Sequence, residues 1–202
     1  MKLLIATHNK GKLLEYQLIF KEFLPELAVL ALSDLNIKEK APEDGATFEE
    51  NAVQKAKFYS GLANLPTLAD DGGLEIDYLN GEPGVKSRRW PGYEASDEEL
   101  VKMALEKLKG IPFEKRGARL RAVAAFALPK EKVFTFEGIL NGFITEKPIN
   151  IIPGYPFRAI FYLPDIKKVL GELTMEEEAV LAHRRKAVEA AIPIIKKHLT
   201  NF

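Results

Sequence analysis

The sequence predicts an α/β fold in which a mixed β-sheet is flanked by helices and is divided into two lobes with a cleft between them. Short apolar strands alternate with amphipathic helical segments in the first half of the chain. Two long strand segments, 118–128 and 132–144, follow each other late in the chain and form a predicted hairpin. The 202 residues are 47% hydrophobic, which is enough to bury a sizeable core.

The first three elements are a strand, a helix and a strand. The strand is expected at 2–7, where three consecutive apolar residues precede turn residues. The helix follows, because the apolar residues between 13 and 20 share a broad face, and Pro25 ends it. The next strand is expected at 28–32, and the acidic segment 38–46 is expected to be a loop because it contains proline and glycine.

The middle of the chain gives two helices and a strand pair. The first of these helices is expected at 47–63, because Thr47 and Glu50 have the spacing of a capping box. The segment 68–77 is expected to form a strand, a tight turn at Asp70-Asp71-Gly72-Gly73 and a second, alternating strand. A helix at 96–107 follows, with Ser96 as its cap and Gly110 beyond its end.

The last third contains the hairpin, a short strand and a helix. The hairpin turn is expected at Pro129-Lys130-Glu131 and the short strand at 160–163. The final helix is expected at 184–199, because its apolar residues form one stripe, and Pro193 is expected to kink it.

The charge balance excludes an overall electrostatic field that would gather a polyanion. Lysine and arginine together number 29, as do aspartate and glutamate, so we expect neither nucleic acid nor an anionic membrane surface as a partner. No apolar stretch is long enough to span a bilayer. The absence of cysteine fits a reducing compartment, and the expected location is cytoplasmic.

The junction ATHNKGK, residues 6–12, is the first candidate site. Backbone N–H groups and the positive end of a helix dipole converge where such a turn enters a helix, so the junction can hold a phosphate. Thr7 and Asn9 can add side-chain donors, and Lys12 adds a cation about one turn into the helix. The sequence leaves open the alternative that Thr7 or Asn9 only caps the helix.

Lys55 is the second candidate. It lies inside the apolar arc of its helix rather than opposite to it. An ammonium that faces the interior needs an anionic partner or a route to solvent. The position therefore favours an anion beside Lys55, and the alternative is a side chain that extends to solvent at the edge of the helix.

Asp70 and Asp71 form the third candidate, because adjacent carboxylates repel each other. A shared divalent cation or a raised pKa of one acid would relieve the repulsion. One acid can then help to hold Mg²⁺ while the other takes a proton from attacking water. The alternative is an acidic turn without function. Glu50 is a further candidate metal ligand, and its alternative role is the capping-box partner of Thr47.

Together, these segments resemble the inosine triphosphate pyrophosphatase family, which removes non-canonical purine nucleotides. ATHNKGK stands against a family ATxNxGK and is followed by GATFEENAVQKA. LADDGGLEIDYLNGEPGVKSRRWPG stands against a pattern close to LADDSGLxVDALxGxPGVxSARYAG. The likeness is dense over residues 1–95. It is patchier beyond, where RLRAVAAFAL and FEGILNGFI occupy the central hairpin and LAHRRKA occupies the SHRxxA region.

The resemblance implies one domain over residues 1–202 without a separable linker, an elongated two-lobed α/β fold around a central cleft, and a homodimer. It implies Mg²⁺-dependent attack of water on the α-phosphorus of a nucleoside triphosphate such as ITP or XTP, giving the monophosphate and pyrophosphate. Asp71 would be the general base, and Glu50, Asp70 and Asp71 would serve the metal. The substrate would be bound by Thr7, Asn9, Lys12, Lys55, Arg89, His183 and Arg184.

The sequence departs from the family pattern mainly at the base end of the expected site. Gly72 stands where the family has serine, and GYPFRAIF at 154–161 replaces GFGYDPIF. Within that stretch, Arg158 and Ala159 stand at the positions of the family's aspartate and proline. Further on, Ala182 replaces the serine of the SHR segment, and Arg185 replaces the small residue after that segment. Arg158 would contact the base and offer donors where a carboxylate offered acceptors, so we expect an altered base preference.

A non-catalytic nucleotide-binding or regulatory protein is the competing interpretation. Gly72 and the rewritten base motif favour it. The retention of Glu50, Lys55 and the two aspartates opposes it, because a protein that only binds nucleotides would have little reason to keep them.

Overall fold

The computed structural model describes residues 2–129, 132–174, 177 and 181–199. Its helices are α1 (Lys10–Phe23), α2 (Phe48–Ala63), α3 (Asp97–Lys107) and α5 (His183–Leu199). Its strands are β1 (Lys2–Ile5), β2 (Ala28–Ala31), β3 (Thr67–Ile76), β4 (Gly117–Ala127), β5 (Val133–Ile144), β6 (Phe161–Leu163) and β7 (Lys168–Val169). None of the described helices combines the length and the apolarity that a membrane span requires.

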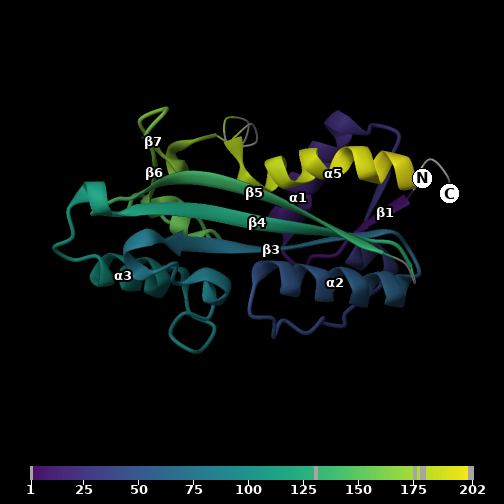
Figure 1. Ribbon diagram of the computed structural model, residues 1–202, viewed down its shortest axis with the longest axis horizontal. Coiled ribbons are helices and arrows are strands. Elements are labelled where there is room, and N and C mark those ends of the chain that lie inside the picture. The colour runs from purple at the N-terminus through teal and green to yellow at the C-terminus, as the bar shows by residue number, and fades with distance from the viewer. Residues whose placement is uncertain (1, 130–131, 175–176, 178–180, 200–202) are drawn as a thin grey trace. The chain divides into compact units, whose positions relative to one another are not determined.

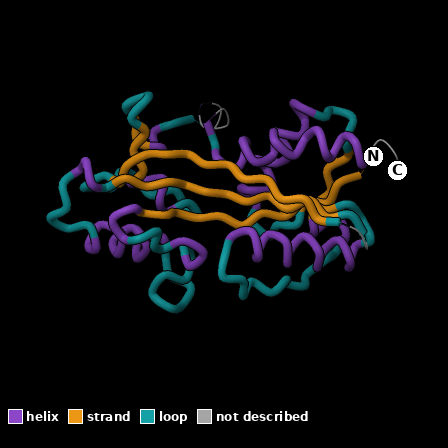
Figure 2. The backbone as a smooth tube through the Cα atoms, in the orientation of Figure 1, coloured by secondary structure: helices purple, strands orange, loops and turns teal. Residues whose placement is uncertain are grey.

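The strands form one sheet in the order β2-β1-β3-β4-β5-β6-β7, drawn in orange in Figure 2. β1 pairs in parallel with β2 and β3. β6 pairs antiparallel with β5 and β7. The sheet is therefore mixed and is accompanied by helices, which confirms the predicted α/β class.

Most elements lie close to their predicted bounds. α2 and α3 begin directly after the predicted caps Thr47 and Ser96. α1 begins at Lys10, earlier than the apolar spacing indicated, because Asn9 caps it. Pro193 lies inside α5, and the predicted kink there stays a prediction. The predicted hairpin turn includes residues 130–131, which lie outside the described residues.

β3 is one continuous strand, so the predicted tight turn at Asp70-Asp71-Gly72-Gly73 is wrong. Neither glycine has a positive φ angle. A Cβ atom at Gly73 would lie 2.1 Å from the Ser87 hydroxyl oxygen, which accepts a hydrogen bond from the Leu74 amide. Gly73 thus leaves room for a neighbouring segment to approach the strand, and the chain does not turn there.

The chain divides into two compact units. The first comprises Met1–Asp71, Ala122–Gly138 and His183–Phe202. Within it, α1 and α5 cover one face of the strands and α2 covers the other (Figure 1). Its buried apolar core includes Tyr16, Phe20, Leu68, Phe126 and Ile195.

The second unit comprises Gly72–Arg121 and Ile139–Ala182. α3 packs there against a short 3₁₀ helix, Pro156–Ile160. Arg116 is only 4% exposed, and its guanidinium donates to the backbone carbonyl oxygens of Leu108, Ile111 and Thr145 at 2.8–2.9 Å. The unit's apolar core includes Leu74, Ile76, Leu100, Ile144 and Phe161.

Candidate functional site

The turn between β1 and α1 is organised by Asn9. The Asn9 side-chain oxygen accepts hydrogen bonds from the backbone N–H groups of Gly11 and Lys12, at 2.8 and 3.1 Å. The Thr7 hydroxyl oxygen accepts a hydrogen bond from the backbone N–H of Asn9 at 3.1 Å. Asn9 is therefore the N-cap of α1, which is the alternative that the sequence left open. Its side-chain NH₂ group, the Thr7 hydroxyl group and the ammonium of Lys12 can still donate to an anion.

Asp70 is buried on the face of β3 that carries α1 and α5. Its Oδ2 atom accepts hydrogen bonds from Lys12 Nζ at 2.9 Å and from Arg184 Nε at 3.1 Å. The Arg184 guanidinium also donates to Glu15. Burial alone would raise the pKa of Asp70, but the positive charges of Lys12 and Arg184 hold it well below its usual range. Asp70 is therefore a fixed anion that holds two cations.

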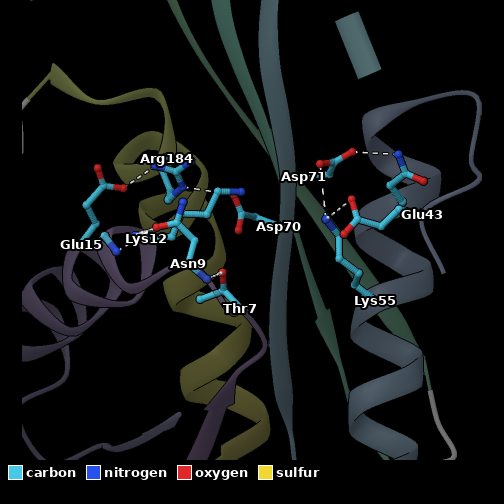
Figure 3. Close-up of polar contacts among 11 residues, drawn as sticks. Thr7, Asn9, Lys12, Glu15, Glu43, Lys55, Asp70, Asp71 and Arg184 are labelled. Carbon is cyan, nitrogen blue, oxygen red and sulfur yellow. Dashed lines mark hydrogen bonds and ion pairs between the residues drawn. The ribbon is translucent and has the colours of Figure 1, made fainter. Parts of the chain in front are cut away.

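Arg184, like Asp70, is buried between side chains of opposite charge. It is 6% exposed and has a carboxylate on each side, Asp70 and Glu15. Burial alone would lower the pKa of Arg184, but these two carboxylates raise it well above its ordinary value. Figure 3 shows Glu15, Lys12, Arg184 and Asp70 together on one side of β3. In this structure Arg184 ties α5 to α1 and β3.

Asp71 points to the other face of β3, toward α2 (Figure 3). Consecutive strand residues alternate between faces, so adjacent aspartates cannot share one face of a continuous strand. The pKa of Asp70 is lowered, so Asp70 is not the acid whose pKa is raised to relieve the repulsion. The two carboxylates point apart: Asp70 pairs with Lys12 and Arg184, and Asp71 pairs with Lys55.

A second polar group surrounds Asp71. Lys55 Nζ lies 3.3 Å from Asp71 Oδ1 and 3.5 Å from Glu43 Oε2. The side-chain NH₂ group of Asn51 donates to Asp71 Oδ2 at 2.9 Å, and the side-chain oxygen of Asn51 accepts from the backbone N–H of Gly45 at 2.8 Å. Burial alone would lower the pKa of Lys55, but the charges of Asp71, Asp70 and Glu43 raise it. The anion predicted beside Lys55 is thus present.

Glu50 lies in the first turn of α2, as expected, and its carboxylate turns back toward the preceding loop. Its Oε2 atom accepts from the Ala46 amide at 2.6 Å, while the Thr47 hydroxyl oxygen accepts from the Glu50 amide at 3.1 Å. Glu50 thus serves the helix N-terminus, although it bonds Ala46 and not the cap residue itself. Its metal role stays a prediction.

The base-side candidates are distributed over both units. Arg89 and Arg158 belong to the second unit, where Arg89 is exposed and the Arg158 guanidinium lies 5.5 Å from the centre of the Tyr155 ring. His183 is half-buried at the start of α5 in the first unit. Burial, followed by the positive charge of Arg184, lowers the pKa of His183 to about 3, so its imidazole is neutral at pH 7.

Two departures from the family pattern have clear structural surroundings. Arg185 donates to both carboxylate oxygens of Glu22 at 2.9 and 2.6 Å, and its guanidinium lies 5.0 Å from the centre of the Phe23 ring. It therefore binds α5 to α1. Ala182, next to the base-side pair, is buried at 7% exposure.

The sequence reasoning gave no role to four polar residues. Glu43 stood in a segment that we interpreted only as a loop, although its acidic composition next to the motif GATFEENA was a usable signal. Glu15 lies three residues after Lys12, which places both on one helix face. Asn51 borders the apolar arc that contains Lys55. Asp97 accepts from Arg88 and from the Gly154 amide, the latter at 2.6 Å, and no local pattern indicates this contact.

Glu43 and Asp71 carry carboxylates, which are the kind of ligand that a divalent cation binds. Among the described residues, no group of three or more histidine, cysteine, aspartate or glutamate side chains is arranged to hold a metal. Glu43 and Asp71 both lie within 3.5 Å of the Lys55 ammonium, which is the cation that they contact in this structure. Mg²⁺ usually binds through one or two carboxylates and completes its shell with water and substrate phosphates.

The comparisons with known proteins agree over almost the whole chain. The Ham1 family model matches residues 3–194. A dITP/XTP pyrophosphatase of Thermoanaerobacter pseudethanolicus is 40% identical and one of Bacillus subtilis 39% identical, over 98% and 92% of both chains respectively. The solved structure of the Staphylococcus aureus Ham1 protein has a TM-score of 0.85 at 31% identity and covers 98% of this chain and 100% of its own. A HAM1 protein structure from Coxiella burnetii has a TM-score of 0.84 at 30% identity, with 98% and 99% covered.

Proposed function

The chain belongs to the Ham1 family, and from this premise we propose that it hydrolyses the triphosphates of non-canonical purines, such as dITP and XTP, to nucleoside monophosphate and pyrophosphate. The carrying observation is the group around Asp71. Asp71 accepts from two side-chain donors, Asn51 at 2.9 Å and the buried Lys55 ammonium at 3.3 Å, and the Glu43 carboxylate lies 3.5 Å from the same ammonium. These contacts support the proposal that this group provides the base and a cation site.

In the proposed reaction, Asp71 takes a proton from water while the water oxygen attacks the α-phosphorus. The bond from the α-phosphorus to the bridging oxygen breaks, and pyrophosphate leaves. Each Asp71 oxygen accepts one hydrogen bond from the protein and keeps a lone pair for the water. Lys55 contributes positive charge on this face of β3, and Lys12 contributes it at the turn, where the side-chain NH₂ group of Asn9 adds a hydrogen-bond donor.

Magnesium bound by Asp71 and Glu43 would offset the charge of the phosphate oxygens. The geometry favours Glu43 over Glu50, because Glu50 bonds the Ala46 amide. It favours a positioning role for Asp70, because that carboxylate holds Lys12 and Arg184 on the opposite face. Glu43→Gln should raise the Mg²⁺ concentration for half-maximal activity by about 10-fold or more, and Glu50→Gln should leave it near the wild-type value. If Glu50→Gln raised the required Mg²⁺ concentration and Glu43→Gln did not, Glu50 would be the metal ligand, as the sequence predicted.

Base preference should depend on the second unit. Arg158 supplies donors at the position of the family's aspartate, so we propose a preference that is altered from that of dITP/XTP enzymes. Values of kcat/KM for dITP, XTP and canonical triphosphates test this proposal. A strong and equal preference for dITP and XTP would show that Arg158 and Ala159 leave selectivity intact.

The assembly and location follow from the family resemblance. We propose a homodimer in the cytoplasm, and the absence of cysteine supports a reducing compartment. Light scattering during size-exclusion chromatography measures the oligomeric state directly. A mass near 22.6 kDa would show a monomer and contradict the proposed dimer.

Pyrophosphate release distinguishes catalysis from nucleotide binding alone. Asp71→Asn should lower kcat with Mg²⁺ by about 100- to 10,000-fold while nucleotide binding, measured by calorimetry, persists. Asp77→Asn is the matched control, because Asp77 is an exposed carboxylate of the second unit. A wild-type protein that binds the triphosphates and releases no pyrophosphate would support the regulatory alternative instead.

A further inference from the structure

The segment that carries Glu43 has no regular secondary structure. Residues 37–45 lie between the 3₁₀ turn Leu32–Leu35 and the Ala46-Thr47 entry to α2, and we call residues 37–46 the Glu43 segment. The backbone polar groups of such a segment need side-chain or solvent partners. The side chains that provide them therefore decide where Glu43 lies.

Tyr59 provides the partners at the start of this segment. The Tyr59 side chain extends from α2 and the residue is 3% exposed. Its hydroxyl donates to the carbonyl oxygen of Glu39 at 2.9 Å and accepts from the Ala41 amide at 3.2 Å. A tyrosine hydroxyl has one further lone pair, so it has room for one more donor.

His8 lies beside the same hydroxyl. Its Nε2 atom is 3.1 Å from the Tyr59 hydroxyl oxygen and 3.1 Å from the Glu39 carbonyl oxygen. Both neighbours have acceptor capacity left, so the contacts assign the proton to Nε2. His8 stands between Thr7 and Asn9 in the turn that caps α1. One side chain of the proposed phosphate turn thus bonds directly to the Glu43 segment.

The end of the segment contacts α2. The Asp44 carboxylate accepts from the Gln54 amide at 2.9 Å, and the Gly45 amide donates to Asn51. A Cβ atom at Gly45 would lie 2.7 Å from the Glu50 Cβ atom, so the backbone lies tightly on the helix. Glu43 therefore lies between an anchor that includes the phosphate turn, at Glu39 and Ala41, and an anchor that does not.

We propose that His8 and Tyr59 are positioning residues that couple the phosphate turn to the Glu43 segment, so that a triphosphate on the turn stabilises the place of Glu43 beside Asp71. The inference rests on the proposed function, because it needs the turn to bind phosphate. Linkage is reciprocal, so a cation bound at Glu43 and Asp71 strengthens triphosphate binding by the same factor. Neither His8 nor Tyr59 touches the reacting atoms in this arrangement.

Amide hydrogen exchange of the whole protein in metal-free buffer tests the coupling with inorganic triphosphate as the probe. In the wild type, triphosphate should slow the exchange of the Glu43 segment by about 5-fold or more, a typical coupling between two sites. In Tyr59→Phe and in His8→Ala, the slowing should fall below about 2-fold although calorimetry still detects bound triphosphate. His8→Gln, which keeps a donor of similar reach, should restore most of the response.

A merely structural role of Tyr59 gives a different pattern. The exchange of the segment would then be faster in Tyr59→Phe without ligand, but the ratio with and without triphosphate would equal that of the wild type. Tyr78→Phe is the matched control, because Tyr78 is 49% exposed in the second unit, and it should respond like the wild type.

The outcomes separate the two proposals. A wild-type protein that releases no pyrophosphate from dITP or XTP in the presence of Mg²⁺ refutes the proposed function. A wild-type protein that binds triphosphate and releases pyrophosphate, together with an undiminished response in Tyr59→Phe and His8→Ala, overturns the coupling and leaves the function standing.

Discussion

Replacing Gly138 by alanine tests how α5 is seated against β5. A Cβ atom at Gly138 would lie 1.8 Å from the carbonyl oxygen of His183 and 2.7 Å from the Ala187 amide nitrogen. Both neighbours are backbone atoms at the start of α5, so they cannot rotate away. Ordinary van der Waals contact begins at 3.4 Å, so the first turn of α5 must move by about 1.6 Å, the difference between 3.4 and 1.8 Å.

The displacement should cost stability and activity together. Overpacking of a close-packed contact costs about 1–3 kcal/mol, and a contact with rigid backbone belongs at the upper end, about 3 kcal/mol. In a chain of this length, that loss lowers Tm by about 6–12 °C. Arg184 follows His183 directly, so the same shift draws its guanidinium away from Asp70, and kcat/KM should fall by about 100-fold.

Gly61→Ala is the matched control, because the same methyl group is added in the same unit. Nothing lies within 4 Å of a Cβ atom at Gly61, which is in α2. Alanine should therefore stabilise the protein by about 0.5–1 kcal/mol. Calorimetric melting and pyrophosphate release measure both variants. A Gly138→Ala protein that melts within about 1 °C of the wild type would refute the close seating of α5.

Three further predictions concern stability. Arg116→Met should lower the free energy of unfolding by about 3 kcal/mol in urea titrations, because three carbonyl oxygens lose a charged donor; a loss under about 1 kcal/mol would contradict this account. The pKa of the His183 imidazole is about 3 in the folded chain, against an ordinary value of 6.5, so between pH 6.5 and about pH 3 the imidazole is protonated in the unfolded chain and neutral in the folded chain. Stability should therefore fall as pH drops from about 6.5 to about 3, and His183→Gln should reduce that slope; an unchanged slope would exclude His183 as its source. Arg185→Ala should destabilise the protein in low salt, and the difference from the wild type should shrink in molar NaCl, because the lost Glu22 pair is screened; a gap that persists would point to packing on Phe23.

The sequence predicted the fold class because local patterns are strong in this chain. Buried strands with consecutive apolar residues and capped amphipathic helices identify most elements, and the caps Thr47 and Ser96 lie where their spacing placed them. The failure at Asp70–Gly73 has a physical reason. Two aspartates and two glycines satisfy the chemistry of a turn, but glycine also serves where another segment approaches, and Ser87 is too distant in sequence to be foreseen.

The sequence predicted which residues of the site carry charge better than it predicted where their side chains point. The position of Lys55 on its helix indicated an anionic partner, and one exists. Strand alternation would have separated Asp70 from Asp71 if the strand had been recognised as continuous. The burial of Arg184 between two carboxylates depends on how α5 packs against α1, which no local pattern encodes. Glu43 lies in an irregular segment, where side-chain direction has no periodicity.

The doubled aspartate has a consequence for strand alignment. β1 and β3 pair with Leu4 opposite Thr67 and Ile5 opposite Leu68. A slip by one residue would interchange the two faces of β3. In one direction Gly72 would take the place of Asp71 beside Lys55, and in the other direction Ala69 would take the place of Asp70 beside Lys12 and Arg184. Either slip would therefore remove a carboxylate from a buried cation, and the exchange of Leu68 and Ala69 would also leave a void on one side and a clash on the other.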